Sequence, residues 1–352
     1  MAAGWEIGSR NDVTKGIMSL GIMKKLLLAI LATTALAACS DHTIDATPNV
    51  AIGFGNVATR AELSDLENNG FGVWAFMDNA SVQNMLIMDN QKVTFDTSVN
   101  DWVYSPVRYW IDESLFHFVA TYPYDANSEY YTLDAENKAV KLTVTETPSQ
   151  VDYLMATNET DTNNAGYNTT VNLQFKHLLT SVGLQIWRDD VKHNADQMRV
   201  KSVTLSNISK GGTYTSETNL WSTNSDKVTV EKVYGEFSDT DNIGAAQVNV
   251  DGTLNTGGIP ANPFNDMLLI PQTLSASNSV SLKIVYELKR QNAASWEEAE
   301  LETILPDITW QPNRRYTYNV VLSSVTDITI YYIQTKVDPW GTPQVGGTVI
   351  IK

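Results

Sequence analysis

The amino-acid sequence predicts an all-β protein with two tandem β-sandwich domains that follow a secretory signal peptide. Short stretches of alternating apolar and polar residues recur along the chain, and Gly, Asn, Asp and Pro separate them. This pattern is typical of antiparallel sandwiches. The chain has 352 residues, 43% of them hydrophobic. The length suits two domains of ~100–200 residues each, and the composition is sufficient for their cores.

The N-terminal region has the pattern of a lipoprotein signal peptide. Lys24 and Lys25 precede an apolar run over residues 26–37, which is too short for a membrane span and has the wrong flanks. Small residues then lead to the chain's single cysteine in Leu36-Ala37-Ala38-Cys39. Small residues admit a signal peptidase and a thiol can carry a lipid, so we expect Cys39 to be acylated, as by palmitate. An ordinary secretory signal with a chance cysteine is the alternative.

We expect translation to start at Met23, so that residues 1–38 comprise a spurious extension and the signal peptide. Residues 39–60 then begin with a polar tether. The tether leads to a short predicted strand with one apolar face, formed by Val50, Ile52 and Phe54. A basic site, Thr59-Arg60-Ala61, follows this strand directly.

The first domain is predicted over residues 61–166. One or two helical turns over 61–68 end at Gly70, and residues 71–76 are apolar on both faces, as in a central strand. Residues 158–168 are polar and rich in turn formers, so we place the domain boundary there. Further strands are predicted around 93–95, 102–104, 116–122, 140–144 and 152–156.

The second domain is predicted over residues 167–352. Residues 296–305 fit either a helix, whose start would be a capping-box pattern, or a strand. The alternation of Leu301, Thr303 and Leu305 favours the strand. Other strands are predicted around 171–175, 182–186, 203–205, 228–230, 248–250, 267–270, 280–286, 316–322, 328–332 and 345–351.

Charge and cysteine content narrow the function classes. With 40 acidic against 24 basic residues, the net charge is −16. This disfavours nucleic acid and anionic membrane surfaces as partners, because both need clustered Lys and Arg. Acylation of Cys39 would leave no thiol, so neither a disulfide nor cysteine catalysis is expected.

No motif predicts catalysis. Residues 53–58 match the dinucleotide fingerprint G-x-G-x-x-A, but no βαβ frame surrounds them, so a Gly-containing strand is favoured. His177 shares a face with Phe175 and is expected to be buried and hydrogen-bonded. Asp189-Asp190 with His193, and residues 238–242, fit exposed turns better than cation sites. We therefore predict no catalytic residue, metal ion or cofactor.

An aromatic cluster is the remaining candidate for ligand binding. Trp102, Tyr104, Tyr109 and Trp110 would stack on sugars if they were exposed together. An inter-strand or core cluster is the favoured interpretation.

Eight motifs, in order, resemble the fimbrillin family, the two-domain pilus-subunit lipoproteins of Gram-negative gut and oral anaerobes (type V pili). Together they span nearly the whole chain after the signal. They are Leu36-Ala37-Ala38-Cys39, Ile52-Gly-Phe54 with Thr59-Arg60-Ala61, Gly72-Val73-Trp74-Ala75, Trp102-Val-Tyr104-Ser-Pro106 with Tyr109-Trp110, Phe116 to Pro123, Phe175-Lys-His177-Leu-Leu-Thr-Ser181, Trp310-Gln-Pro312 with Tyr316 to Val320, and Val337-Asp-Pro-Trp340.

The resemblance implies transthyretin-like sandwiches and assembly by strand exchange at the cell outer membrane. A lipoprotein signal peptidase and an Arg-specific surface protease would act in turn, the second between Arg60 and Ala61. This cut would remove the strand 49–57 that completes the first domain. The strand's apolar residues Val50, Ile52, Phe54 and Val57 would contribute about 6–12 kcal/mol when buried.

The vacated groove would accept a C-terminal strand of the next subunit. The candidate donor residues are Val345, Thr348, Val349, Ile350 and Ile351. Gly346 and Gly347 weaken this donor, so residues 330–332 are an alternative.

The leading hypothesis is thus a non-catalytic stalk or tip subunit of a surface pilus that mediates adhesion. Its partners would be other pilus subunits, the outer membrane through the lipid, and a host or bacterial surface receptor. The alternative is a surface-exposed glycan-binding lipoprotein that keeps its lipid, and a hydrolase ranks third.

Overall fold

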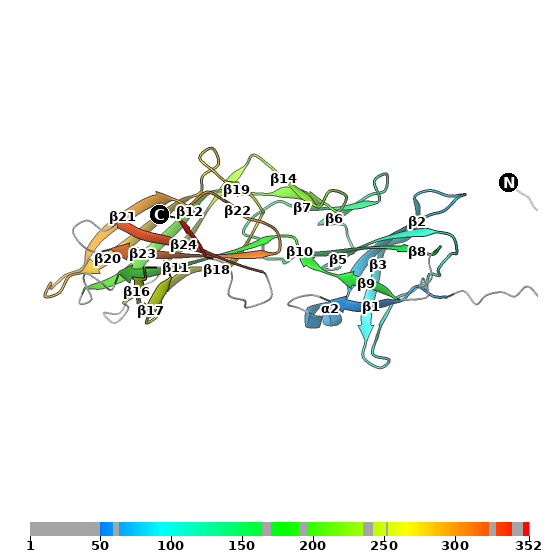
Figure 1. Ribbon diagram of the computed structural model, residues 1–352, viewed down its shortest axis with the longest axis horizontal. Helices are drawn as coiled ribbons and strands as arrows, with labels where there is room; N and C mark the ends of the chain where they lie inside the picture. The colour runs from blue at the N-terminus through cyan, green and yellow to red at the C-terminus, as the bar shows by residue number, and fades with distance from the viewer. Residues whose placement is uncertain are drawn as a thin grey trace, which may run out of the picture. The chain divides into compact units, whose positions relative to one another are not determined.

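The structure is a computed structural model. It describes residues 50–58, 63–163, 170–189, 196–234, 242–250, 253–323, 329–339 and 348–351. Within these ranges the chain folds almost entirely into strands, which confirms the predicted all-β class (Figure 1). No helix in the described part of the chain combines the length and hydropathy needed to cross a membrane.

The N-terminal part of the fold has three layers, which we call the N-terminal layers. A six-stranded antiparallel sheet is the middle layer. Its strand β2 is buried along nearly its whole length, because alternate side chains enter cores on opposite faces. On one face of the sheet, β2 contributes Phe71, Val73 and Ala75 to a hydrophobic core that we call the first core. On the other face it contributes Trp74 and Phe76 to a second core. The strand order is β10 (Lys176–His177), β8 (Leu154–Asp161), β5 (Leu115–Tyr122), β2 (Phe71–Asp78), β3 (Met85–Asp96) and β4 (Asp101–Val103).

Two further layers cover this sheet and explain why β2 is apolar on both faces. Elements that contribute to the first core are the parallel pair β1 (Phe54–Ala58) and β9 (Val171–Gln174) and the helix α2 (Leu63–Asn69). The second core is shared with a four-stranded sheet, seen as β14, β7 and β6 in Figure 1. Its order is β14 (Leu220–Thr223), β13 (Gly212–Thr215), β7 (Ala139–Val144) and β6 (Tyr131–Asp134).

The C-terminal sandwich encloses the third core between a seven-stranded and a four-stranded sheet. Alternate residues of β20 point into this core, as the strand's regular burial pattern shows. One sheet contains β17 (Leu254–Gly257), β16 (Ala245–Val248), β11 (Thr180–Asp189), β23 (Arg314–Ser323), β24 (Thr329–Pro339) and β25 (Thr348–Ile351), with β18 (Ala261–Leu269) also paired to β11. The other contains β15 (Lys227–Val233), β12 (Gln197–Ser209), β20 (Ser281–Lys289) and β21 (Glu297–Ile304). A small pair joins β19 (Thr273–Leu274) to β22 (Ile308–Thr309).

Several local predictions are confirmed. The helix α2 ends at Gly70, which adopts a positive φ of 74° that favours glycine. Residues 297–304 form a strand, as the alternation indicated, and not a helix. Residues 54–58 of the dinucleotide-like motif form a strand as well.

Two boundaries were wrong. The strand predicted at 50–54 begins only at Phe54 and extends to Ala58, because its partner β9 lies beside these later residues. Residues 158–161, predicted as part of a turn, continue β8 because they pair with β5. The domain boundary at 166/167 stays a prediction; residues 171–177 pair with β1 and β8 of the N-terminal layers.

Candidate functional site: the N-terminal segment and its seat

The most informative site surrounds residues 50–58, which we call the N-terminal segment. We call the groups that hold it the seat: β9, residues 108–110, and the rings of Phe71, Tyr104 and Phe118. Some of the predicted site residues, namely Cys39, Arg60, Ala61 and Val345, lie outside the described residues. The contacts given below are therefore those of the predicted removable strand.

Backbone hydrogen bonds join the start of the segment to residues 108–110. The Ile52 N–H donates to the Arg108 carbonyl oxygen at 2.9 Å. The Trp110 N–H donates to the Val50 carbonyl oxygen, also at 2.9 Å. If the segment left, the backbone groups of Arg108 and Trp110 would lose these partners, and an open strand edge of this kind is a template for another strand.

The other edge of the segment lies against β9. The Val171 N–H donates to the Gly53 carbonyl oxygen at 2.8 Å. Beyond it, Phe54 lies opposite Val171 and Gly55 opposite Asn172 in a parallel register. The segment is thus inserted between two pieces of chain that are more than fifty residues apart in sequence.

Three side chains of the segment are buried in the first core. Ile52 and Phe54 are each 1% exposed and Val57 is 7% exposed. Val50 packs against the same core but is only partly buried. The Phe54 ring contacts the seat through edge-on packing, with centroids 6.2 Å from Phe71, 5.5 Å from Tyr104 and 6.3 Å from Phe118.

Two glycines let the segment pass close to the Thr170 side chain. A Cβ on Gly55 would lie 2.4 Å from the Thr170 Oγ1, and a Cβ on Gly53 would lie 3.1 Å from the Thr170 Cγ2. The two glycines that resemble a dinucleotide motif therefore serve close packing against the residue before β9.

Tyr104 adds a polar contact to the otherwise apolar seat. Its hydroxyl donates to the Ile52 carbonyl oxygen at 2.7 Å. Burial raises the pKa of the Tyr104 hydroxyl, and the smaller effect of Arg108 opposes this rise. The hydroxyl thus stays protonated and remains a donor to the segment at physiological pH.

The predicted cleavage site lies in a short connection between two anchored elements. Val57 near the end of β1 and Leu66 in α2 are both buried in the first core. The four residues 59–62 between these elements, which include Arg60 and Ala61, are outside the described residues.

The candidate donor strand is the last element of the C-terminal sandwich. The strand β25 pairs antiparallel with β24, with Ile351 opposite Ile333 and Thr348 opposite Lys336. It ends the strand order of its sheet, whereas β24 is paired on both sides, with β23 and β25. The alternative donor, residues 330–332, belongs to β24.

The aromatic residues considered as a sugar platform do not share an exposed surface. Trp102 and Trp110 are 9% and 6% exposed and belong to the first core. Tyr104 packs on the N-terminal segment, and Tyr109 alone of the four is largely exposed. The favoured interpretation as a core cluster is therefore confirmed for the two tryptophans.

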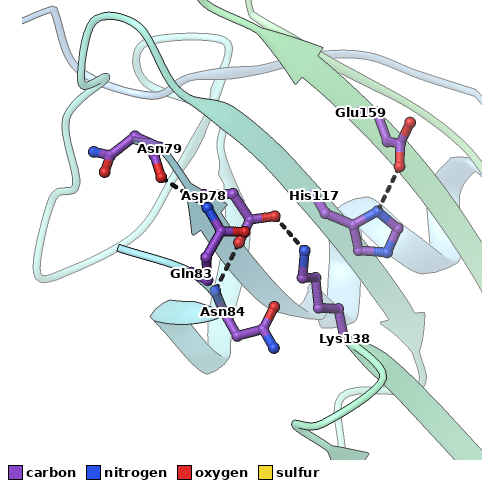
Figure 2. Close-up of polar contacts among 7 residues, drawn as sticks. All are labelled: Asp78, Asn79, Gln83, Asn84, His117, Lys138 and Glu159. Carbon is purple, nitrogen blue, oxygen red and sulfur yellow. Dashed lines mark hydrogen bonds and ion pairs between the residues drawn. The ribbon is translucent and has the colours of Figure 1, made fainter. Parts of the chain in front are cut away.

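The polar network in Figure 2 connects layers of the fold. Asp78, at the end of β2, forms an ion pair with Lys138, which lies in the turn before β7. Its Oδ1 also accepts the Asn84 N–H at 2.6 Å. Burial alone would raise the pKa of the Asp78 carboxyl, but the hydrogen bonds from Lys138 and Asn84 outweigh it and lower the pKa. The ion pair joins the six-stranded sheet to the sheet that contains β7.

The two histidines in the described part of the chain, His117 and His177, take structural positions. The His117 Nδ1 lies 3.3 Å from the Glu159 Oε1, on neighbouring strands β5 and β8 (Figure 2). His177 is 3% exposed, and its Nδ1 lies 2.7 Å from the Asp152 Oδ2, which confirms the predicted buried, hydrogen-bonded histidine.

The residues considered for cation binding are only partly visible. Residues 190–195 and 235–241, which contain most of the two cation patterns, lie outside the described residues. Among the described residues, no group of three His, Cys, Asp or Glu side chains is placed to hold a metal ion.

Comparison with known proteins adds the family context. The Fimbrillin-like family model matches residues 59–340. Among solved structures, a fimbrial protein from Bacteroides vulgatus ATCC 8482 is similar, with a TM-score of 0.60 and 19% sequence identity over 82% of this chain and 99% of that one. A candidate cell adhesion protein from Bacteroides uniformis ATCC 8492 also has 19% identity, over 83% and 99% of the two chains, with a TM-score of 0.43. Among curated proteins, none matches the sequence.

Proposed function

Because the chain belongs to the Fimbrillin-like family, we propose that it is a structural, non-catalytic subunit of a cell-surface type V pilus, in the stalk or at the tip. The family match and the fimbrial neighbour support a pilus-type adhesion subunit that associates with other pilus subunits. Under this proposal the chain reaches the outer membrane as a lipoprotein acylated at Cys39. An Arg-specific protease then cuts between Arg60 and Ala61.

The burial of the N-terminal segment is the observation that carries the proposal. Ile52, Phe54 and Val57 are almost fully buried, and together they contribute about 4.5–9 kcal/mol at ~1.5–3 kcal/mol each. A segment with this contribution keeps the precursor stable while it is present. Its removal exposes an apolar groove that another apolar strand can fill.

We further propose that β25 of a neighbouring subunit fills this groove. As the terminal strand of its sheet order, β25 has one paired neighbour, so its release breaks fewer backbone hydrogen bonds than the release of β24 would. Of the candidate donor residues, Val349, Ile350 and Ile351, with Val345 before them, have apolar side chains for the vacated seat, and Thr348 is the polar member.

N-terminal sequencing of sheared surface filaments tests the cleavage step. We expect filament subunits to begin at Ala61. The matched variant Arg60→Lys keeps the positive charge but removes the arginine, so it should accumulate as an uncleaved lipoprotein outside the filaments. Filaments whose subunits begin at Cys39 would contradict the proposal.

A second experiment tests the exchange step. A chain that begins at Ala61 should bind a peptide of residues 345–352 and should polymerise, whereas a chain that begins at Ser40 should do neither until it is cut. If the chain from Ala61 refuses both the peptide and polymer growth, strand exchange at this seat is wrong.

A further inference from the structure

A surface pocket of about 280 Å³, which we call the β8 pocket, lies beside the six-stranded sheet and shares Asn172 and Gln174 of β9 with the seat of the N-terminal segment. It is formed by β8, β9, β10 and the β13–β14 hairpin. β10 pairs with only Leu154 and Met155 of β8, so the rest of this strand edge faces the pocket region. The volume lies just below the ~300–1,000 Å³ range of ligand sites, which suits a small ligand.

The pocket combines an apolar floor with an amide-rich rim. Met155, Leu178 and Tyr214 are each at most 6% exposed and line its inner side. The rim contains four side-chain amides, from Asn158, Asn172, Gln174 and Asn219. Amide groups both donate and accept hydrogen bonds, which matches the hydroxyl groups of a saccharide. An apolar floor with part of a tyrosine ring suits the C–H face of a sugar ring.

Internal hydrogen bonds hold two of these amides in place before any ligand binds. The Tyr214 hydroxyl donates to the Asn219 Oδ1 at 2.9 Å. The Asn158 Nδ2 donates to the Asn172 carbonyl oxygen at 3.1 Å. Fixed polar groups of this kind reduce the entropy lost on binding.

The charge of the pocket differs from that of the chain. Although the net charge is −16, the lining residues include Lys176 and no aspartate or glutamate. Within the described part of the chain, the ammonium group of Lys176 has no carboxylate partner. Lys176 is the one ionised side chain among the lining residues, and charges more than about 8 Å away are largely screened at physiological salt.

We propose that the β8 pocket binds a carboxylate-bearing saccharide unit. Lys176 would hold the carboxylate, the amides of Gln174 and Asn219 would hold the hydroxyls, and the floor formed by Met155, Leu178 and the exposed edge of Tyr214 would lie against the apolar face. This binding site goes beyond the proposed pilus role and does not depend on strand exchange. It uses none of the aromatic residues Trp102, Tyr104, Tyr109 and Trp110.

Ligand-observed saturation-transfer NMR on the uncleaved chain from Ser40 tests the site without any polymerisation. The probes are digalacturonic acid and its methyl ester, which differ in charge but little in size. We expect saturable binding of the acid and weaker binding of the ester. Lys176→Met should weaken the acid about two- to fivefold, as expected for one exposed ion pair, and should leave the ester unchanged. The control Lys232→Met removes an exposed lysine of β15 and should change neither Kd.

Gln174→Leu should weaken both probes, because it removes an amide and keeps the charge of Lys176. Absence of saturable binding of the acid, or equal binding by the Lys176→Met variant, would overturn the proposal. So would binding of the peptide of residues 345–352 at the β8 pocket in place of the saccharide, since the pocket would then be a strand-docking edge. Each variant should have the same thermal unfolding temperature as the parent protein, which verifies that its fold is intact.

Discussion

Replacing Phe54 with alanine should lower the free energy of unfolding of the uncleaved N-terminal layers by about 3–5 kcal/mol. The side chain is 1% exposed, and its ring centroid lies within 6.3 Å of the centroids of three aromatic rings of the seat. Truncation removes these contacts and leaves a cavity, because neighbours on separate strands cannot all move inward. We therefore expect Phe54→Ala to lower the free energy of unfolding as much as the truncation of a core phenylalanine does, although Phe54 belongs to a segment that we propose is removed.

Guanidinium chloride unfolding of the chain from Ser40, followed by tryptophan fluorescence, measures this loss. Trp74, Trp102 and Trp110 report on the N-terminal layers, and separate fitting of two transitions allows for independent unfolding of the C-terminal sandwich. Phe118→Ala is the matched control, since Phe118 is 0% exposed in the same core and should cost a similar amount. Val99→Ala, at a position 62% exposed, should cost almost nothing.

A loss below about 1 kcal/mol for Phe54→Ala, with the expected loss for Phe118→Ala, would refute the reasoning. It would show that the N-terminal segment is not an integral part of the first core. The seat would then not be a site whose filling controls stability, and the strand-exchange proposal would lose its energetic basis.

Three further predictions concern the same layers. Tyr104→Phe should cost about 1 kcal/mol in the uncleaved chain, because its hydroxyl donates to Ile52, and should cost less in a chain from Ala61, where only the 3.3 Å contacts with the Arg108 backbone remain; equal costs in the two chains would contradict this. Gly55→Ala should destabilise the uncleaved chain by about 1–3 kcal/mol because its Cβ would lie 2.4 Å from the Thr170 Oγ1, and adding Thr170→Ala should recover part of the loss in the same denaturation assay. The Asp125 carboxylate accepts three backbone N–H groups at 2.7–2.9 Å; burial opposes its ionisation, but these bonds outweigh burial and lower its pKa. The ionised Asp125 carboxylate should stabilise the folded chain fully above the ordinary pKa of 3.8, and this stabilisation should disappear as the pH falls through the lower pKa of the folded state. The difference in unfolding free energy between the parent and Asp125→Ala should therefore shrink on acidification. A difference that grew would contradict the assignment.

Local patterns in the sequence predicted those features that depend on neighbouring residues. Apolar residues on both faces of 71–76 identified a strand between two cores, because period-two alternation reports burial on each face. The alternation over 297–304 outweighed a helix-start pattern for the same reason. The shared face of Phe175 and His177 correctly indicated a buried histidine.

Features that depend on distant pairing were not predictable from these patterns. No local pattern indicates that β13 pairs with β7, about seventy residues earlier in the chain, and that Tyr214 lies in the second core. Residues 158–161 carry turn-forming side chains, yet pairing with β5 keeps them in β8. The ion pair between Asp78 and Lys138 and the β8 pocket likewise arise only when separate strands meet.

The position of β9 has a mechanical consequence. β9 contacts the N-terminal segment and, after β10, leads within a few residues into β11 of the C-terminal sandwich. β11 pairs with β23 at eight successive positions, and β23 pairs with β24. The proposed donor strand β25 follows β24 in the chain and would give up its pairing with β24 on entering the next subunit's seat. In a fibre joined through the seat, a pulling force would enter at one strand and leave at another after crossing continuous ladders. Such ladders resist sliding by sharing the force among many hydrogen bonds, so within the C-terminal sandwich the tension would be carried by the paired strands β11, β23 and β24.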